Sequence, residues 1–570
     1  MKLILKYLSK FKMGSILAPL FKLLEALIDL AIPYLIGLLI DNGIYKNDKH
    51  YILLMFLIMI SCAFVGLLFS IIGQYFSAKT ATLVSSTMRK DLFKHIEKLN
   101  FESIDNIGTV GLINRLTNDI NQVQNGVNLL LRLILRSPFV VFGSVILATI
   151  LAPKVSYIFW IVIGILFIFT FIIMLSSIPI INKQQAKLDD LLQHSKDNLT
   201  GTRVIRTFGI ENDEIDNFNK ENNNLLNIQK KSTIVSSFLN PVTYLIINLC
   251  IVLLIYLGAL KVNDGILSSG NVISLYNYMG QILIELIKFT NLVILINKMI
   301  VSSNRINEIL KIKITDNIVI DNNIYNNYIK FDNVSFAYNK GNVLHNINFE
   351  INKGDFLGII GPTGSGKTTL INLLLHSYNI SDGKIIFNGK NISNYKPSDV
   401  YKRISVTNQK IILFKGTIRD NLLISNPNAT DEELIAALRD AQCGDFILNK
   451  DNPLDLKVGY KGRNFSGGQR QRLAMARCIA SKKEVLIFDD STSALDFLTD
   501  SNFRTSLKNL SFKPTIIIIS QRASTMLNTD KILVLDGGKQ LGFDNNVNLL
   551  KDCSMYQSIY YTQFSKEDNK

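Results

Sequence analysis

Six long apolar runs in the first half of the chain constrain its fold more than any other feature. They cover roughly residues 16–40, 51–76, 127–150, 155–181, 234–262 and 272–297. Each run is about long enough to cross the hydrocarbon layer of a bilayer as one helix, and a helix satisfies its own backbone polar groups where no water is present. The sequence therefore predicts an α-helical transmembrane bundle of six spans, which excludes an ordinary soluble protein.

The connections between these runs differ in length. Those after the first, third and fifth runs are short, whereas those after the second and fourth are about fifty residues long and have helical character. Lysine and arginine concentrate in the N-terminal segment and in the long connections, at Lys79, Arg89, Lys90, Lys94, Lys98, Arg115, Lys183, Lys187, Arg203 and Arg206. Because basic residues favour the cytoplasmic side, we expect the N-terminus and both long connections there, in a multi-pass protein of the cell membrane.

The chain is basic, with a net charge of +15. A nucleic-acid partner is one explanation, but the charges are spread out without an arginine-rich arm, so we expect cytoplasmic loops of a membrane protein and no nucleic acid. The N-terminal MKLILKYLSKFKMG has no cleavage-site pattern and indicates a basic amphipathic helix lying on the membrane. The five cysteines form no C-x-x-C pair, which is typical of isolated reduced thiols.

The first apolar run contains three charged residues, Lys22, Glu25 and Asp29. Charges inside a membrane are costly and usually face the protein interior or a watery cavity. Two interpretations remain open for them. They line a substrate path, or they form a salt bridge among neighbours at helical spacing.

The second half of the chain has a different pattern. Residues 311–327 are polar, rich in asparagine and without an apolar period, which indicates a linker after a transmembrane domain of residues 1–310. From residue 328 to about 565, short β-rich runs such as FLGIIG, EVLIFDD and PTIIIIS alternate with helical stretches. This alternation predicts an α/β domain with a largely parallel central sheet.

One segment of this domain fits the phosphate-binding pattern G-x-x-x-x-G-K-[ST] without a mismatch. It follows an apolar strand, precedes a helix, and consists of Gly361, Pro362, Thr363, Gly364, Ser365, Gly366, Lys367 and Thr368, with Thr369 next. Its backbone N–H groups and the helix N-terminus suit phosphate groups. Lys367 would reach the terminal phosphates of ATP and Thr368 would ligate Mg²⁺.

Two further segments support this assignment. The buried strand Val485–Asp489 ends in a carboxylate, the expected second Mg²⁺ ligand at the carboxyl edge of the sheet. About twenty residues earlier, a second glycine-containing helix start provides another anion-binding N-terminus. It consists of Phe465, Ser466, Gly467, Gly468 and Gln469.

Taken together, the chain resembles a half-transporter of the ATP-binding-cassette superfamily, in the exporter class with the membrane domain first. GPTGSGKT resembles the Walker A loop, VLIFDD the Walker B strand and FSGGQ the family signature. The resemblance implies an adenine-stacking role for Tyr338, a Q-loop role with a Mg²⁺ contact for Gln409, and a D-loop formed by Ser493, Ala494, Leu495 and Asp496. It also implies a type-1 exporter fold in which two cassettes enclose two ATP molecules, each held between the Walker loop of one chain and the signature of the other.

Three positions depart from that family pattern. The residue after the Walker B aspartate, usually a glutamate that acts as general base, is Asp490, which is one methylene shorter. The switch residue, usually histidine, is Gln521, which cannot become cationic. The segment before the signature, usually acidic, is Lys457–Gly462 with two lysines. A misplaced base costs on the order of a hundredfold in rate, so the site is expected to bind ATP and hydrolyse it slowly.

The expected function is ATP-driven export of amphipathic small molecules, of the multidrug type, by a heterodimer. This chain resembles the degenerate-site subunit, and its partner would be a second half-transporter with an intact base and switch histidine. Two alternatives remain open: a lipid or peptide exporter that acts as a homodimer, and an ATP-gated channel or regulatory subunit with little turnover.

Overall fold

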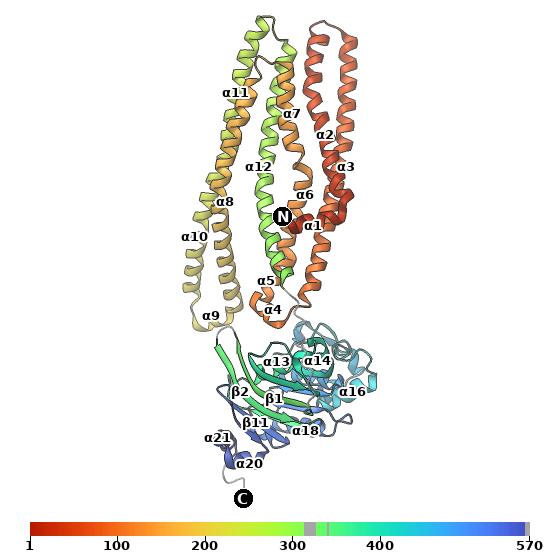
Figure 1. The fold of residues 1–570 in the computed structure, drawn as a ribbon, viewed down its shortest axis with the longest axis vertical. Helices are drawn as coiled ribbons and strands as arrows, with labels where there is room; N and C mark the ends of the chain where they lie inside the picture. The colour runs from red at the N-terminus through yellow and green to blue at the C-terminus, as the bar shows by residue number, and fades with distance from the viewer. Residues whose placement is uncertain (313–325, 339–340, 565–570) are drawn as a thin grey trace. The chain divides into compact units, whose positions relative to one another are not determined.

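In the computed structural model, residues 1–312, 326–338 and 341–564 are described, so most of the predicted linker at 311–327 lies outside the described residues. The chain divides into two compact units (Figure 1). The first consists of residues 1–99 and 107–313, and the second of residues 100–106 and 314–570. A short segment of the N-terminal half, residues 100–106, therefore belongs to the second unit.

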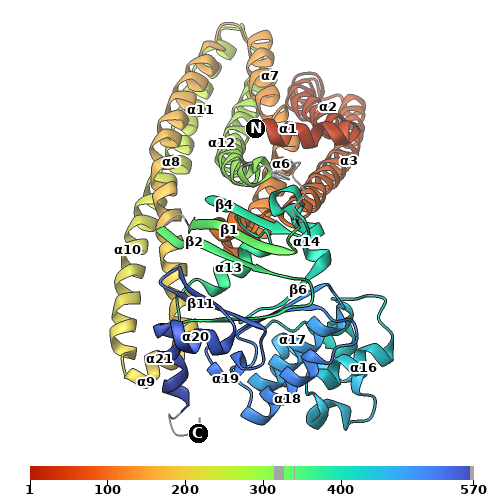
Figure 2. The same ribbon diagram turned by 60° about the horizontal axis from the view of Figure 1, so that its bottom comes forward.

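The first unit is a helical bundle, and among its described residues six helical segments are long and apolar enough to span a membrane, as the sequence predicts. Its helices are α1 (Lys2–Leu8), α2 (Lys12–Leu38), α3 (Lys49–Ile96), α5 (Thr109–Asn114), α6 (Ile120–Leu133), α7 (Arg136–Leu151), α8 (Tyr157–Thr200), α9 (Thr202–Phe208), α10 (Glu211–Ser237), α11 (Leu239–Asn263) and α12 (Ser269–Lys311). Helix α2 runs beside α3, and α8 runs beside both α10 and α11 (Figures 1 and 2).

The long connections are helical extensions of the membrane spans. Helix α3 has 48 residues and α8 has 44. At 1.5 Å of rise per residue, α3 is about 70 Å long, more than twice the thickness of a hydrocarbon layer. Each helix therefore continues well beyond its apolar run, as expected for the long connections.

Helices α2 and α12 approach each other closely. A Cβ atom at Gly270 would lie 2.2 Å from the carbonyl oxygen of Gly37, so glycine is required there. Ser274 Oγ donates to the Pro33 carbonyl at 2.8 Å, and the Tyr278 hydroxyl donates to the Leu30 carbonyl at 2.9 Å. Small residues and interhelical hydrogen bonds are the usual means of helix association in lipid, where apolar burial alone gives little.

The second unit is built on a ten-stranded sheet in the order β5-β4-β1-β2-β12-β11-β3-β10-β9-β6. The strands are β1 (Ile329–Tyr338), β2 (Gly341–Ile351), β3 (Phe356–Ile360), β4 (Asp382–Phe387), β5 (Lys390–Asn391), β6 (Ile404–Thr407), β9 (Val485–Asp489), β10 (Thr515–Ile519), β11 (Lys531–Asp536) and β12 (Lys539–Asp544). Strands β11, β3, β10, β9 and β6 are mutually parallel, as predicted, whereas β5, β4, β1 and β2 pair antiparallel. The sheet is therefore mixed, a division that the strand pattern alone did not reveal.

Helices cover both faces of the parallel strands. The cassette helices are α13 (Lys367–Leu374), α14 (Pro397–Arg403), α15 (Ile418–Leu423), α16 (Asp431–Asp440), α17 (Gly467–Ala480), α18 (Phe497–Lys508), α19 (Ala523–Met526), α20 (Asn546–Asp552) and α21 (Ser554–Gln563). On β9, Val485 and Ile487 pack in the same cluster as α13, while Leu486 and Phe488 pack with α17. Figure 2 shows α16, α17 and α18 grouped together. Alternate residues of a strand thus fill two separate cores.

Candidate nucleotide-binding site

The phosphate-binding loop lies between β3 and α13, in the context that the sequence predicts. All five residues of β3 are buried, so the strand fixes the start of the loop in the middle of the sheet. Gly366 has φ +96°, and a Cβ atom there would lie 2.6 Å from the Leu344 side chain. Gly364 also has positive φ, at +84°. Glycine tolerates this conformation, and the turn it permits directs the backbone N–H groups of the α13 start toward one space.

Lys367 lies folded over the loop. Its ammonium donates to the carbonyls of Gly361 and Pro362 at 2.8 and 2.7 Å. Burial lowers the pKa of Lys367, and the nearby carboxylates of Asp489 and Asp490 oppose that effect. The ammonium is thus held by neutral carbonyls and is free to exchange them for phosphate oxygens, which are stronger acceptors.

Thr368 and Asp489 form the pair expected to hold Mg²⁺. The Thr368 hydroxyl donates to a carboxylate oxygen of Asp489 at 2.9 Å, although 121 residues separate the two. Asp489 is 4% exposed, and burial raises its pKa. A divalent cation would relieve that cost, and hydroxyl and carboxylate oxygens are suitable ligands for Mg²⁺, which takes its remaining ligands from water and phosphates. These residues therefore fit the ion.

Most of the predicted nucleotide-site residues surround one cavity of about 300 Å³. Its lining consists of Val343, Thr363, Gly364, Ser365, Gly366, Lys367, Thr368, Thr369, Gln409, Asp489, Asp490, Ile519, Ser520 and Gln521. Both residues that depart from the family pattern, Asp490 and Gln521, are among them. Sequence reasoning missed Val343, Ile519 and Ser520, of which the last two directly precede the switch residue.

Asp490 has an unusual backbone, with φ +48°. Left-handed conformations are uncommon outside glycine, although aspartate tolerates them better than most residues. Burial raises the pKa of Asp490, and a hydrogen bond from Gln409 together with the charges of Lys367 and Arg522 partly offsets this effect. The carboxylate is therefore held among polar partners inside the cavity.

Tyr338 and the loop residues Gly361 and Pro362 do not line this cavity. Tyr338 lies at the end of β1, is 36% exposed, and meets the rings of Phe336 and Tyr378 edge-on at 4.7 and 5.3 Å. Gly361 and Pro362 contribute their carbonyls to Lys367 instead. The structure thus leaves the ring of Tyr338 accessible at the protein surface, and its role in adenine stacking stays a prediction.

The signature residues lie at the start of α17. Ser466 caps this helix by accepting from the backbone N–H of Gln469, whose side chain accepts from the N–H of Ser466 in return. This reciprocal arrangement is a capping box, which explains the helix start without any ligand. Phe465 meets the ring of Phe446 edge-on, and a Cβ atom at Gly467 would meet nothing within 4 Å. None of the signature residues lines the cavity.

Two side chains that the sequence did not single out hold the D-loop in place, Gln471 of the signature helix and Arg522, the residue after Gln521. Gln471 of α17 donates to Ser493 Oγ at 3.1 Å and accepts from the Ala494 N–H at 3.1 Å. Arg522 donates to the carbonyls of Ser493 and Leu495 at 3.0 and 3.1 Å. Asp496 caps α18, and hydrogen bonds from Thr499 lower its pKa.

The switch residue is also held by a side chain that sequence reasoning missed. Gln563 of α21 donates to the Gln521 carbonyl at 2.8 Å and accepts from the Ala523 N–H at 2.7 Å. No short-range signal reveals this contact, because Gln563 lies 42 residues beyond Gln521.

The fold and the site together define a membrane helical bundle joined to a P-loop nucleotide-binding domain. The chain matches the model of the ABC transporter transmembrane region over residues 15–286 and that of the ABC transporter over residues 344–493. It is 30% identical to the ATP-dependent lipid A-core flippase of Haemophilus influenzae, over 97% of this chain and 95% of the relative. The chain therefore belongs to the ABC transporter family, as an exporter-type half-transporter, and the family couples ATP hydrolysis to transport.

Two further likenesses agree with this assignment. The chain is 29% identical to the uncharacterized ABC transporter ATP-binding protein YfiB of Bacillus subtilis, over 99% of both chains. A solved structure of a bacterial Atm1-family ABC exporter with ATP bound shares the fold, with a TM-score of 0.85 at 22% identity over 97% of this chain and 99% of that one. The predicted fold class, a six-span bundle followed by an α/β cassette, is thus confirmed.

Proposed function

We propose that this chain is one half of a heterodimeric exporter of amphipathic small molecules, and that its own nucleotide site hydrolyses ATP slowly. The observation that carries the proposal is that Asp490 and Gln521 line the same cavity as Lys367 and Thr368. Two changes in groups used for hydrolysis thus fall at one site, while the groups used for ATP binding are intact. The signature, which would serve the partner's site, is also intact.

The proposed division of labour follows from the chemistry of each side chain. Lys367 and the N–H groups at the α13 start bind phosphate oxygens, and Thr368, Asp489 and Gln409 would hold Mg²⁺, which neutralises charge on the transferred phosphoryl group. Asp490 is the group that would accept a proton from the attacking water. Its carboxylate is about 1 Å short of the reach of glutamate, and a displacement of that size costs on the order of a hundredfold in rate.

The ATPase rate of the purified full-length chain tests this proposal. Alone, the chain should be nearly inactive, and mixed with its partner it should hydrolyse ATP. In the mixture, Asp490→Ala should cost far less than Ser466→Ala, because the signature serves the active site and Asp490 does not. In the lone chain, Asp490→Glu combined with Gln521→His should raise the rate about a hundredfold. Brisk hydrolysis by the unmodified lone chain would overturn the asymmetric scheme.

A lipid exporter that acts as a homodimer is the second candidate function. It is favoured by the 30% identity with a relative whose name is ATP-dependent lipid A-core flippase. Movement of labelled lipids between leaflets distinguishes the two, because the homodimer would move lipid in vesicles that contain this chain alone. The heterodimer would require the second half-transporter in the same vesicles.

A further inference from the structure

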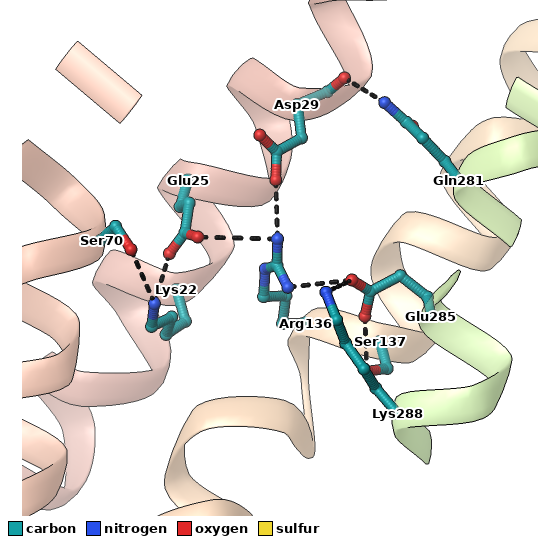
Figure 3. Close-up of polar contacts among 9 residues, drawn as sticks. All are labelled: Lys22, Glu25, Asp29, Ser70, Arg136, Ser137, Gln281, Glu285 and Lys288. Carbon is teal, nitrogen blue, oxygen red and sulfur yellow. Dashed lines mark hydrogen bonds and ion pairs between the residues drawn. The ribbon is translucent and has the colours of Figure 1, made fainter. Parts of the chain in front are cut away.

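The membrane bundle contains a network of nine polar residues drawn from four helices (Figure 3). We call it the polar network, and it consists of Lys22, Glu25 and Asp29 on α2, Ser70 on α3, Arg136 and Ser137 on α7, and Gln281, Glu285 and Lys288 on α12. The sequence leaves two interpretations open for the α2 charges, a substrate path or a salt bridge among neighbouring residues. A salt bridge between neighbours accounts only for Lys22 and Glu25, whose charged atoms lie 2.6 Å apart. The remaining partners come from α3, α7 and α12.

Arg136 is the centre of the polar network. One of its terminal nitrogens lies 2.7 Å from Asp29 and 3.6 Å from Glu25, and the other lies 2.9 Å from Glu285. The side chain of Arg136 is 13% exposed and that of Glu285 is 4% exposed. A charge in the middle of a membrane protein persists only when it is paired, and this pair joins α7 to α12 in the interior of the bundle.

The two outer members of the polar network are accessible and carry opposite charges. The side chain of Asp29 is 35% exposed, and that of Lys288, which lies 2.8 Å from Glu285, is 39% exposed. On α2 the apolar residues Leu20, Leu27 and Tyr34 form an exposed stripe that suits lipid. At 100° per residue, Asp29 lies about 200° around the helix from Leu27, so its carboxylate faces away from that stripe.

Two buried atoms of the polar network have no hydrogen-bond partner among the described residues. Gln281 donates to the Asp29 carbonyl at 2.7 Å, which leaves its own side-chain oxygen unused. The Nε–H of Arg136 is also unpaired. Buried polar atoms are nearly always satisfied by protein groups, ordered water or a ligand, so the unused acceptor of Gln281 and the unused donor of Arg136 are available to water or to a ligand with both kinds of group.

We propose that the polar network binds the zwitterionic headgroup of an amphiphile, with a primary ammonium against Asp29 and Gln281 and an anionic group against Lys288 and Arg136. This proposal rests on the proposed export of amphiphiles and names their class. The network holds three carboxylates and three cationic groups, so its charges balance before a ligand binds, and a ligand with a single charge would disturb that balance in a medium of low dielectric constant. A headgroup with both charges keeps the balance and offers a further partner to Asp29 and to Lys288, and a primary ammonium can donate to the Gln281 oxygen, whereas a quaternary ammonium has no N–H to donate.

The test is lipid retention by the full-length chain, measured by native mass spectrometry after incubation with one lipid at a time. Phosphatidylethanolamine, phosphatidylcholine and phosphatidylglycerol with identical acyl chains are the probes. The unmodified chain should retain phosphatidylethanolamine about tenfold better than the other two. Asp29→Asn should remove that preference without lowering the retention of phosphatidylglycerol. Lys288→Gln should lower the retention of both phosphatidylethanolamine and phosphatidylglycerol.

The exposed ion pair Lys187–Asp190 on α8 offers matched controls, because Lys187→Gln and Asp190→Asn make the same chemical changes outside the polar network. Both controls should retain the lipids as the unmodified chain does. The proposal would be overturned if the unmodified chain retained all three lipids equally, or if both test variants lost all three equally. The polar network would then serve only to hold α2, α7 and α12 together. The assay needs no ATP, so failure of the heterodimer scheme would not alter its result.

Discussion

Two adjacent carboxylates at the end of β9 are under different constraints, because Asp489 is the last residue of the strand and Asp490 follows it. Asp489 belongs to the strand and pairs with Thr368, whereas Asp490 turns into the left-handed region and faces the cavity. Burial raises the pKa of both. A carboxyl group whose pKa is higher in the folded than in the unfolded state makes the folded protein less stable as the pH rises through that interval. The two desolvated carboxylates thus lower the stability of the folded protein at neutral pH, and they place negative charge where a cation and a water would bind.

We therefore expect Asp490→Asn to stabilise the protein in the absence of Mg²⁺ and nucleotide. The neutral amide removes the cost of a desolvated charge, so the thermal midpoint at pH 7 should rise by about 2 °C. The gain should disappear near pH 3, where the carboxyl of the unmodified protein is protonated. Thermal unfolding at several pH values measures both effects.

The control for this prediction is Asp382→Asn, which makes the same change at an exposed position on β4. It should leave the midpoint unchanged across the pH range. A midpoint lowered at pH 7 by Asp490→Asn would show that the polar partners of Asp490 outweigh its desolvation.

Among the elements, helix α21 contacts the switch residue Gln521 and its neighbour Ala523 through Gln563, although it lies far from them in the sequence. The motifs predicted the loop, the Walker B strand and the signature helix, because each depends on residues close together in the chain. The contacts of Gln563 with Gln521 and Ala523, and of Arg136 with Asp29 and Glu285, join residues 40 to 149 positions apart. Periodicity predicts which face of an element is buried, but tertiary packing decides which element it meets, so these partners were not predictable from local patterns.

Gln563→Ala should loosen residues 521–523, which we call the switch segment. The side chain makes two hydrogen bonds there, one of them to the N–H of Ala523. Loss of about 1 kcal/mol of local stability corresponds to about fivefold faster amide exchange, which hydrogen exchange with mass spectrometry would detect in peptides that contain Ala523.

Gln557→Ala provides the comparison on the same helix, because Gln557 donates to the carbonyls of Leu550 and Lys551 rather than to the switch segment. It should leave exchange at Ala523 unchanged. Similar exchange in both variants would show that α21 does not hold the switch segment through Gln563.

On the scale of the whole molecule, the distribution of charge along the chain predicts its orientation in the membrane. The connection between α11 and α12 is short, whereas α3 and α8 carry apolar runs into long polar extensions rich in lysine and arginine. Basic residues resist translocation, so these extensions should be cytoplasmic and the short connection should lie outside. This orientation would place the nucleotide site where ATP is available, since the cassette follows α12 in the chain.

Cysteine labelling would test this orientation directly. The five cysteines are all free thiols, so their replacement by serine gives a background without disulfide loss. Two exposed positions then report on opposite sides: Asp264→Cys in the short connection and Lys220→Cys in α10. A membrane-impermeant maleimide should label position 264 in intact cells, and position 220 only after permeabilisation, because the reagent cannot cross the bilayer. The reverse pattern would contradict the charge-based orientation, and labelling of both positions in intact cells would contradict the assignment of α11 as a single complete span.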